Sequence, residues 1–370
     1  MPGRTTALSI SAIPRYRLQS QQITGTKLET AAEIVGWFGA MQAQDYLASL
    51  WAVGLRTPGA TERSIEQAIA DGSIVRTWPM RGTLHFVAAA DARWMLELMT
   101  PRVIATHAKR LKREYDIDER VCAQSAEVLR HALQGGGRLS RPDIYRTLEA
   151  AGIPALGQRG LHILGRLAQE RVVCFGPREG KQPTFLLFDE WLPGARSLDH
   201  DEALERIATR YFTSHGPATL HDFTWWSGLT MADARTGVEM AREHLRSEEI
   251  DGVGYWLSRD ASPDPRKARG VDLLPAYDEY TVAYRDRSAV LAPESITQTI
   301  SSNGIFNPII VIDGRVAGTW KRTLSKGTVI ITPNPFRPLT RTELTSLAKA
   351  AARYAAFLSL PTETRFKAEG

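Results

Sequence analysis

Apolar residues in the middle of the chain recur with helical spacing, and two short apolar runs follow them. Residues 121–133 predict a first helix, and a second opens with Ser140 as its N-cap and Pro142 in its first turn. After a break that contains glycine, residues 158–171 predict a third helix, and residues 172–188 predict a β-hairpin around a polar turn. This order is typical of a winged helix, whose third helix can enter a DNA groove. A helical hairpin beside a small sheet is the simpler alternative.

A second segment with the same order of elements lies further along the chain. Residues 202–214 predict a helix, Thr219 caps a second helix, and Thr230 caps a third helix over residues 231–245. A hairpin through residues 250–257 follows. The pattern predicts another winged-helix copy.

The start of the chain has a third, weaker version of the pattern. Residues 30–41 and 62–71 predict helices, and residues 73–87 would form the wing. Tandem copies at a regular interval indicate an array, here an arc that could wrap a duplex.

Beyond the last hairpin the pattern changes from helical to alternating. Residues 258–270 predict a polar connector, and the dipeptide Asp313-Gly314 between two apolar runs is a strong signal for a tight turn. Thr340 then caps a last amphipathic helix over residues 341–358. The predicted strands of this region are residues 271–275, 281–284, 308–312, 315–320 and 327–332.

Together these patterns predict an α+β fold of three tandem winged-helix units, braced by a small barrel-like C-terminal sheet and a terminal helix. The predicted domains are residues 1–115, 116–198, 199–262 and 263–370.

The composition is that of an ordinary globular protein with a mild basic excess. The 370 residues are 43% hydrophobic and 24% charged, with 46 Lys and Arg against 41 Asp and Glu. A net charge of +5 suits a polyanionic partner without proving one. The first residues contain no apolar leader segment, and no apolar run is long enough to span a bilayer, so we expect a cytoplasmic, nucleoid-associated protein.

Several separate motifs, found in order along nearly the whole chain, resemble one family. They are Gln42-Ala-Gln44, the segment 76–85 (RTWPMRGTLH), the segment 225–235 (WWSGLTMADAR), the segment 273–280 (LLPAYDEY) and the segment 311–320 (VIDGRVAGTW). The chain is similar to the bacterial winged-helix DNA glycosylases of the AlkZ/YcaQ family. The Gln-x-Gln form resembles the AlkZ branch, associated with azinomycin self-resistance, because the YcaQ branch carries Asp at the position of Gln44.

The resemblance implies a monofunctional DNA glycosylase that hydrolyses the N-glycosidic bond of alkylated purines, above all N7-alkylguanine. It also implies DNA repair by unhooking of azinomycin-type interstrand crosslinks. Gln42 and Gln44 would then position a water and stabilise the sugar cation, since a carboxamide both donates and accepts hydrogen bonds.

The spacing of the two glutamines restricts the backbone conformations in which their side chains can act together. On an ideal helix, side chains two residues apart diverge by about 200°, so they converge only at a helix end or in a turn. Asp45 is a third catalytic candidate, either as a carboxylate that activates water or as the N-cap of the next segment. Asp278 and Glu279 are weaker carboxylate candidates, since such a pair more often stabilises a turn.

Cationic side chains at two predicted hairpins are candidates for DNA contacts. The hairpin after Trp320 carries three cations near its tip, although lysines also protect edge strands from aggregation. The predicted DNA-binding residues are Arg76, Arg81, His85, Arg285, Lys321, Arg322 and Lys326.

We expect double-stranded DNA with alkylated bases as the partner, a monomer, and neither metal nor cofactor. The eight histidines and two cysteines have no metal-ligand spacing, and no Gly-rich phosphate loop is present. The main alternative is a non-enzymatic DNA-binding protein such as a transcriptional regulator, because winged helices mostly serve that role. A protein–protein scaffold is the third possibility.

Overall fold

The computed structural model describes residues 8–25, 27–262 and 269–366 of the chain. The chain folds into two compact units, each built from separated stretches. The larger unit comprises Met1–Phe38, Gln44–Ile65 and Leu204–Gly370, and the smaller unit comprises Gly39–Ala43 and Glu66–Ala203. The four predicted domains are consecutive stretches of the chain, and these two units are not. The predicted domain boundaries and the predicted number of winged-helix copies stay predictions. Residues 263–268 of the predicted connector lie outside the described residues.

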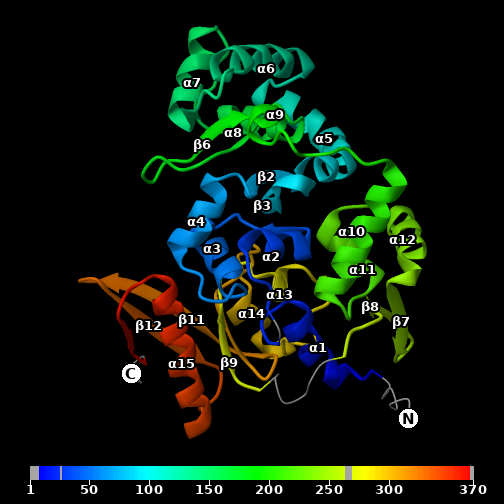
Figure 1. Cartoon of the computed structure of the whole chain (residues 1–370), viewed down its shortest axis with the longest axis vertical. Helices are drawn as coiled ribbons and strands as arrows, with labels where there is room; N and C mark the ends of the chain where they lie inside the picture. Colours follow the sequence, from blue (N-terminus) through cyan, green and yellow to red (C-terminus); the bar gives the residue numbers. More distant parts are fainter. Residues whose placement is uncertain (1–7, 26, 263–268, 367–370) are drawn as a thin grey trace. The chain divides into compact units, whose positions relative to one another are not determined.

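The smaller unit contains all the helices and strands predicted for the middle winged-helix copy (Figure 1). They are α6 (Glu119–Leu133), β4 (Leu139–Ser140), α7 (Arg141–Ala150), α8 (Gln158–Gln169), β5 (Val173–Phe175) and β6 (Thr184–Leu187). The strands form an antiparallel sheet in the order β4-β6-β5. Ser140 caps α7 as predicted, since its hydroxyl accepts the N–H of Asp143 at 3.4 Å. Ile163, Leu164 and Leu167 of α8 are fully buried in the core.

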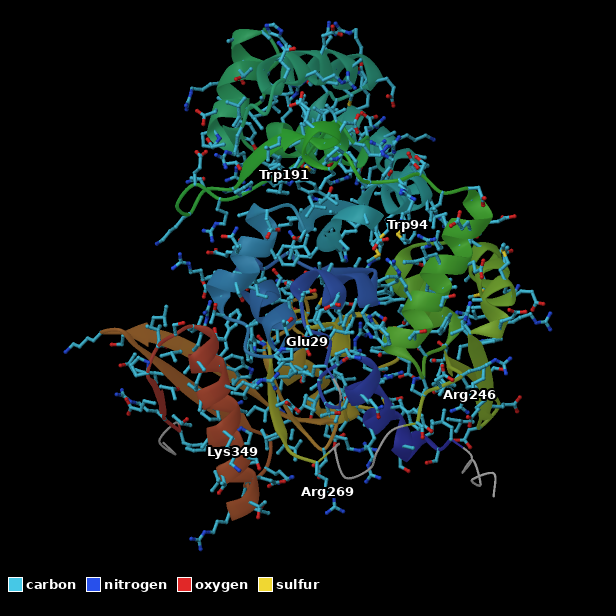
Figure 2. All side chains as sticks on the ribbon, viewed as in Figure 1. Glu29, Trp94, Trp191, Arg246, Arg269 and Lys349 are labelled. Atoms are coloured by element: carbon cyan, nitrogen blue, oxygen red, sulfur yellow. The ribbon has the colours of Figure 1, made fainter. Side chains whose placement is uncertain are left out.

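A second sheet of the smaller unit holds the segment that carries Gln42. It consists of β1 (Ala40–Gln42), β3 (Thr83–Ala88) and β2 (Ile74–Met80) in the order β1-β3-β2, so the predicted wing over residues 73–87 is a hairpin. The Trp78 ring on β2 lies 5.1 Å from the Phe175 ring on β5, which joins this sheet to the core of the middle copy. The helix α5 (Ala92–Tyr115) follows, and the buried Trp94 near its start donates its indole N–H to Asp91 at 3.0 Å (Figure 2).

The larger unit contains most of the remaining helices. They are α1 (Ile13–Ser20), α2 (Ala31–Phe38), α3 (Tyr46–Gly54), α10 (His200–His215, from Leu204 onward), α11 (Leu220–Ser227) and α12 (Met231–Met240). Thr219 and Thr230 cap α11 and α12 as predicted, each with a complete capping box. The third helix is shorter than the predicted 231–245, because Leu245 already begins the hairpin of β7 (Leu245–Ile250) and β8 (Val253–Ser258). The helix α4 (Glu62–Ala70) passes from the larger unit into the smaller one.

A five-stranded open sheet forms the C-terminal part of the larger unit. Its order is β13-β12-β11-β10-β9, from β13 (Thr362–Thr364), β12 (Thr328–Pro335), β11 (Arg315–Ser325), β10 (Ile309–Ile312) and β9 (Val271–Leu274). Asp313 and Gly314 have φ angles of 49° and 86°, which suits the predicted tight turn between β10 and β11. Thr340 caps the predicted last helix, α15 (Arg341–Phe357), and Lys349 lies on the exposed face of that helix (Figure 2).

One predicted strand of this region is wrong. Residues 281 and 282 belong to a short helix, α13 (Glu279–Val282), which Asp278 caps by accepting the Tyr280 N–H at 2.9 Å. The β-branched residues there suggested a strand, but the buried Asp278 carboxylate fixes a helical turn. The other short helices are η1 (Ile10–Ala12), η2 (Ala89–Asp91), α9 (Phe188–Trp191), η3 (Ala241–Glu243), η4 (Pro293–Ser295) and α14 (Ile296–Thr299).

Candidate active site and DNA-binding surface

The two glutamines lie where a strand leads into a helix. The predicted helix over residues 30–41 ends already at Phe38, because Gly39 adopts a φ of 79° and the chain then extends as β1. Gln42 is the last residue of β1, and Gln44 lies in the bend before α3. Gln42 lies on the extended backbone of a strand, so the divergence expected on a helix does not apply to it.

Asp45 is the N-cap of α3. Its Oδ1 accepts the backbone N–H of Ala48 at 3.1 Å, and the side chain is exposed. Of the two roles considered for Asp45, the structure contains the capping one.

Two polar side chains share a sheet face with Gln42. The strand register pairs Gln42 with His85 and His85 with Thr77, and paired residues point to the same face. Gln42 is 8% exposed, while His85 and Thr77 are fully buried. His85 Nδ1 lies 3.0 Å from the Thr83 carbonyl oxygen, which can only accept, so Nδ1 carries a proton and donates it to that oxygen. This burial withdraws His85 from the residues that we propose as DNA contacts.

Arg76 contacts the backbone between the two glutamines. Its Nε and Nη2 both donate to the Ala43 carbonyl oxygen, at 3.0 and 2.7 Å. Its guanidinium carbon lies 5.0 Å from the centre of the Phe175 ring. Sequence reasoning placed Arg76 among the DNA contacts, and only the strand pairing brings it to Ala43.

Two further residues predicted to contact DNA, Arg81 in the smaller unit and Arg285 in the larger unit, lie at turns. Arg81 has a φ of 54° and is half-buried in the turn that joins β2 to β3. Arg285 is exposed, and its backbone N–H donates to the buried carboxylate of Asp222 at 2.9 Å. The Asp222 contact fixes the backbone of the Arg285 turn and leaves the guanidinium on the surface.

The cationic side chains of the β11–β12 hairpin differ in their exposure to solvent. Lys321 and Lys326 are exposed, and Lys326 lies in the two-residue turn with a φ of 48°. Arg322 is half-buried, and its Nη1 donates to the Tyr354 hydroxyl at 2.5 Å. Burial raises the pKa of Tyr354 to about 12, so this hydroxyl stays neutral. Leu324, one residue before Ser325 at the end of β11, is 60% exposed.

The paired carboxylates Asp278 and Glu279 serve the interior of the larger unit. Asp278 forms a two-bond ion pair with Arg56, at 2.8 and 2.9 Å, and both side chains are fully buried. Glu279 accepts the indole N–H of Trp226 at 3.1 Å and lies 3.3 Å from His215 Nε2. Neither carboxylate reaches the surface of the larger unit, so we do not place them in the active site.

The described residues contain neither a candidate metal site nor a candidate membrane span. Across 8–25, 27–262 and 269–366, no group of three or more His, Cys, Asp or Glu side chains could hold a metal ion. Cys122 and Cys174 are free thiols, and burial raises the pKa of Cys122 to about 11. Within the same ranges, no helix has both the length and the apolar character that a membrane span needs.

Comparison with known proteins gives the class of enzyme. Residues 35–357 match the family model described as "DNA glycosylase AlkZ-like". This match spans most of the chain, so the protein belongs to the AlkZ-like DNA glycosylase family and is a DNA glycosylase. The predicted family is thereby confirmed, and the transcriptional regulator is not favoured.

Two matches come from one organism, Streptomyces sahachiroi. The chain is 27% identical over 340 residues to its "Interstrand DNA cross-link repair glycosylase", with 86% of this chain and 89% of that protein covered. The solved structure of "Streptomyces sahachiroi DNA glycosylase AlkZ" superposes with a TM-score of 0.80 at 24% identity. That superposition covers 98% of this chain and all of the other, and it establishes the shared fold.

Proposed function

We propose that this glycosylase hydrolyses the N-glycosidic bond of N7-alkylguanine in double-stranded DNA, as a monomer and without a metal. The observation that carries the proposal is the Gln42-Ala-Gln44 connection, in which carboxamides stand beside a carboxylate that caps a helix. Alkylation at N7 gives the base a positive charge, so the base leaves as a neutral molecule. The enzyme then has to position water and stabilise positive charge on the sugar, which carboxamide dipoles can do.

The weak basicity of glutamine also supplies selectivity. A neutral base leaves as an anion and needs an acid or a strong electrostatic contribution, which a carboxamide does not provide. Undamaged DNA is therefore spared because its bases are poor leaving groups. Asp45 remains the carboxylate that would have to act if neutral bases were excised.

Lyase chemistry through a Schiff base requires a nucleophilic lysine, and Lys27 is the one to consider. Burial, with repulsion from Arg353 and Arg56, lowers the pKa of Lys27 to about 7. Its ammonium nitrogen nevertheless contacts three backbone carbonyl oxygens, of Gln22, Ile23 and Leu55, at 2.5, 2.8 and 3.3 Å. An amine held in this way binds the backbone, so we propose a monofunctional enzyme.

The β11–β12 hairpin is the proposed DNA contact of the larger unit. Lys321 and Lys326 are free to reach phosphates, and the exposed Leu324 between them has the character of an apolar wedge for the minor groove. Lysines that only protect an edge strand would not need an exposed leucine beside them. Arg285 is a further candidate for phosphate contact, and Arg81 stays a candidate at the turn of the smaller unit.

We extend the proposal to azinomycin-type interstrand crosslinks, in which both attached guanines are alkylated. The similar protein from Streptomyces sahachiroi is described as a crosslink repair glycosylase. A guanine that is tethered to the opposite strand cannot be flipped fully into a closed pocket. Action on crosslinks would thus require an active site that is reached without full base flipping.

The test is release of free base from matched duplexes that contain N7-methylguanine, uracil or only normal bases. We expect N7-methylguanine to be released and the other two duplexes to stay intact. Equal rates on N7-methylguanine and uracil would contradict the proposed mechanism and point to Asp45. Release of no base at all would contradict the proposed substrate.

A further inference from the structure

The carbonyl group between the two glutamines is held by a side chain from another strand. Arg76 lies on β2, and its Nε and Nη2 both donate to the Ala43 oxygen. The backbone N–H of Ala43 donates to the Leu84 carbonyl on β3 at 2.8 Å. Both polar groups of Ala43 are therefore fixed by neighbouring strands.

This double attachment restricts the backbone that carries the Gln42 side chain. Gln42 precedes Ala43 and Gln44 follows it, and the chain leaves the sheet at this point. Fixing the N–H and the carbonyl of one residue fixes its two peptide planes, which restricts the backbone of the residues on either side. A displacement of a catalytic carboxamide by about 1 Å can lower the reaction rate on the order of a hundredfold.

We propose that Arg76 is a positioning residue for base excision rather than a contact to DNA. The inference rests on the function proposed above, in which Gln42 and Gln44 act on water and the sugar. Two guanidinium donors in one plane converge on one oxygen, and the guanidinium carbon lies 5.0 Å from the centre of the Phe175 ring. Lysine carries the same charge as arginine, but all of its donors are on one nitrogen and it has no planar face, so it cannot reproduce the contact that two nitrogens make with one carbonyl oxygen.

The chain offers a matched control in Arg93, in the same unit. The Arg93 Nε donates to the Ala195 carbonyl at 3.2 Å, and its guanidinium carbon lies 5.3 Å from the centre of the Phe188 ring. Arg93 thus makes these two kinds of contact away from the glutamine segment, and its Nη2 also forms an ion pair with Asp189. Any loss of rate that comes only from removing a half-buried arginine should appear in both variants.

The experiment compares Arg76→Lys, Arg93→Lys and wild type. Three quantities are measured on an N7-methylguanine duplex: the single-turnover excision rate at saturating enzyme, the Kd over a range of salt, and the midpoint of thermal unfolding. We expect Arg76→Lys to excise roughly ten- to a hundredfold more slowly, with Kd and salt dependence unchanged. Arg93→Lys should excise at the wild-type rate.

Other results would overturn the positioning role. An unchanged excision rate in Arg76→Lys, or an equal loss in Arg93→Lys, contradicts it. If Arg76→Lys is poorly folded, Arg76→Gln retains one donor for the carbonyl and should keep more activity than Arg76→Met. A lower salt slope of binding in Arg76→Met, with its excision rate intact, would assign Arg76 to a phosphate instead.

Gln42→Ala and Gln44→Ala, assayed in parallel, separate this inference from the proposed function. If both glutamine variants excise at the wild-type rate, the proposed active site is wrong and the role of Arg76 falls with it. If either glutamine variant is slow while Arg76→Lys is fast, the site stands and only the positioning role is refuted.

Discussion

The two exposed lysines of the β11–β12 hairpin should account for a measurable share of the salt dependence of DNA binding. Lys321 and Lys326 are exposed, and within the described ranges neither side chain forms a hydrogen bond or an ion pair. Arg322 differs, because the Tyr354 hydroxyl accepts from it. The change that isolates phosphate contact is therefore the double substitution Lys321→Ala and Lys326→Ala.

The size of the effect follows from the number of contacts. Each phosphate contact contributes about 0.9 to the slope of log K against log salt concentration, so two lost contacts reduce the slope by about 1.8. Between about 50 and 200 mM salt, a fourfold change, this slope corresponds to roughly a twelvefold change in affinity. Arg322→Ala should have a smaller effect on the slope, since part of its hydrogen-bonding capacity is used within the protein.

Fluorescence anisotropy with an undamaged and a damaged duplex, titrated over this salt range, gives both slopes. Lys349→Ala, on the exposed face of α15 in the same unit, is the control and should leave the slope unchanged. The double variant should lose affinity for both duplexes equally, because phosphates carry no information about the base. A slope equal to that of wild type would refute the DNA contact and leave the lysines as protection of an edge strand.

Three further predictions concern chemistry and stability. Borohydride should trap no covalent complex with an abasic duplex, because Lys27 is bound to backbone carbonyls; a trapped adduct that disappears in Lys27→Ala would show lyase activity. Exhaustive EDTA treatment should leave excision unchanged, whereas a loss that one added metal restores would contradict metal-free catalysis. Asp278→Asn should lower the free energy of unfolding in urea by about 3–5 kcal/mol, because it leaves the buried Arg56 without its charged partner. Glu343→Gln, in the partly exposed pair with Arg337, should cost much less, and equal losses would refute this reasoning.

Local signals explain why much of the fold could be predicted from the sequence. Ser140, Thr219 and Thr230 each accept a hydrogen bond from the backbone N–H three residues later. The start of each helix is therefore determined by residues that are close together in the sequence. The turn at Asp313-Gly314 is equally local, since positive φ angles favour these two residue types. Helices and turns of this kind do not depend on distant parts of the chain.

The errors occurred where distant segments decide the local structure. Gln42 is in a strand because β3, more than forty residues later, pairs with it, and no nearby residue signals that pairing. The segment after Asp278 is helical because of a buried carboxylate that Arg56 neutralises from far away in the sequence. The contact of Arg76 with Ala43 has the same origin, so sequence reasoning could only place Arg76 on a wing.

The division of the chain into two units also could not be predicted from the sequence. The chain leaves the larger unit after Phe38, contributes one strand to the smaller unit, and returns at Gln44. Domains predicted from composition and repeats are continuous stretches, so they cannot reproduce such a path.

The most direct test of the central claim is the single-turnover excision of N7-methylguanine by wild type, Gln42→Ala and Gln44→Ala. Removing one positioned polar contact from a transition state costs on the order of 3 kcal/mol, or roughly a hundredfold in rate. The account predicts such a loss in each glutamine variant, with affinity for the damaged duplex nearly unchanged. Excision at the wild-type rate by both variants would contradict it.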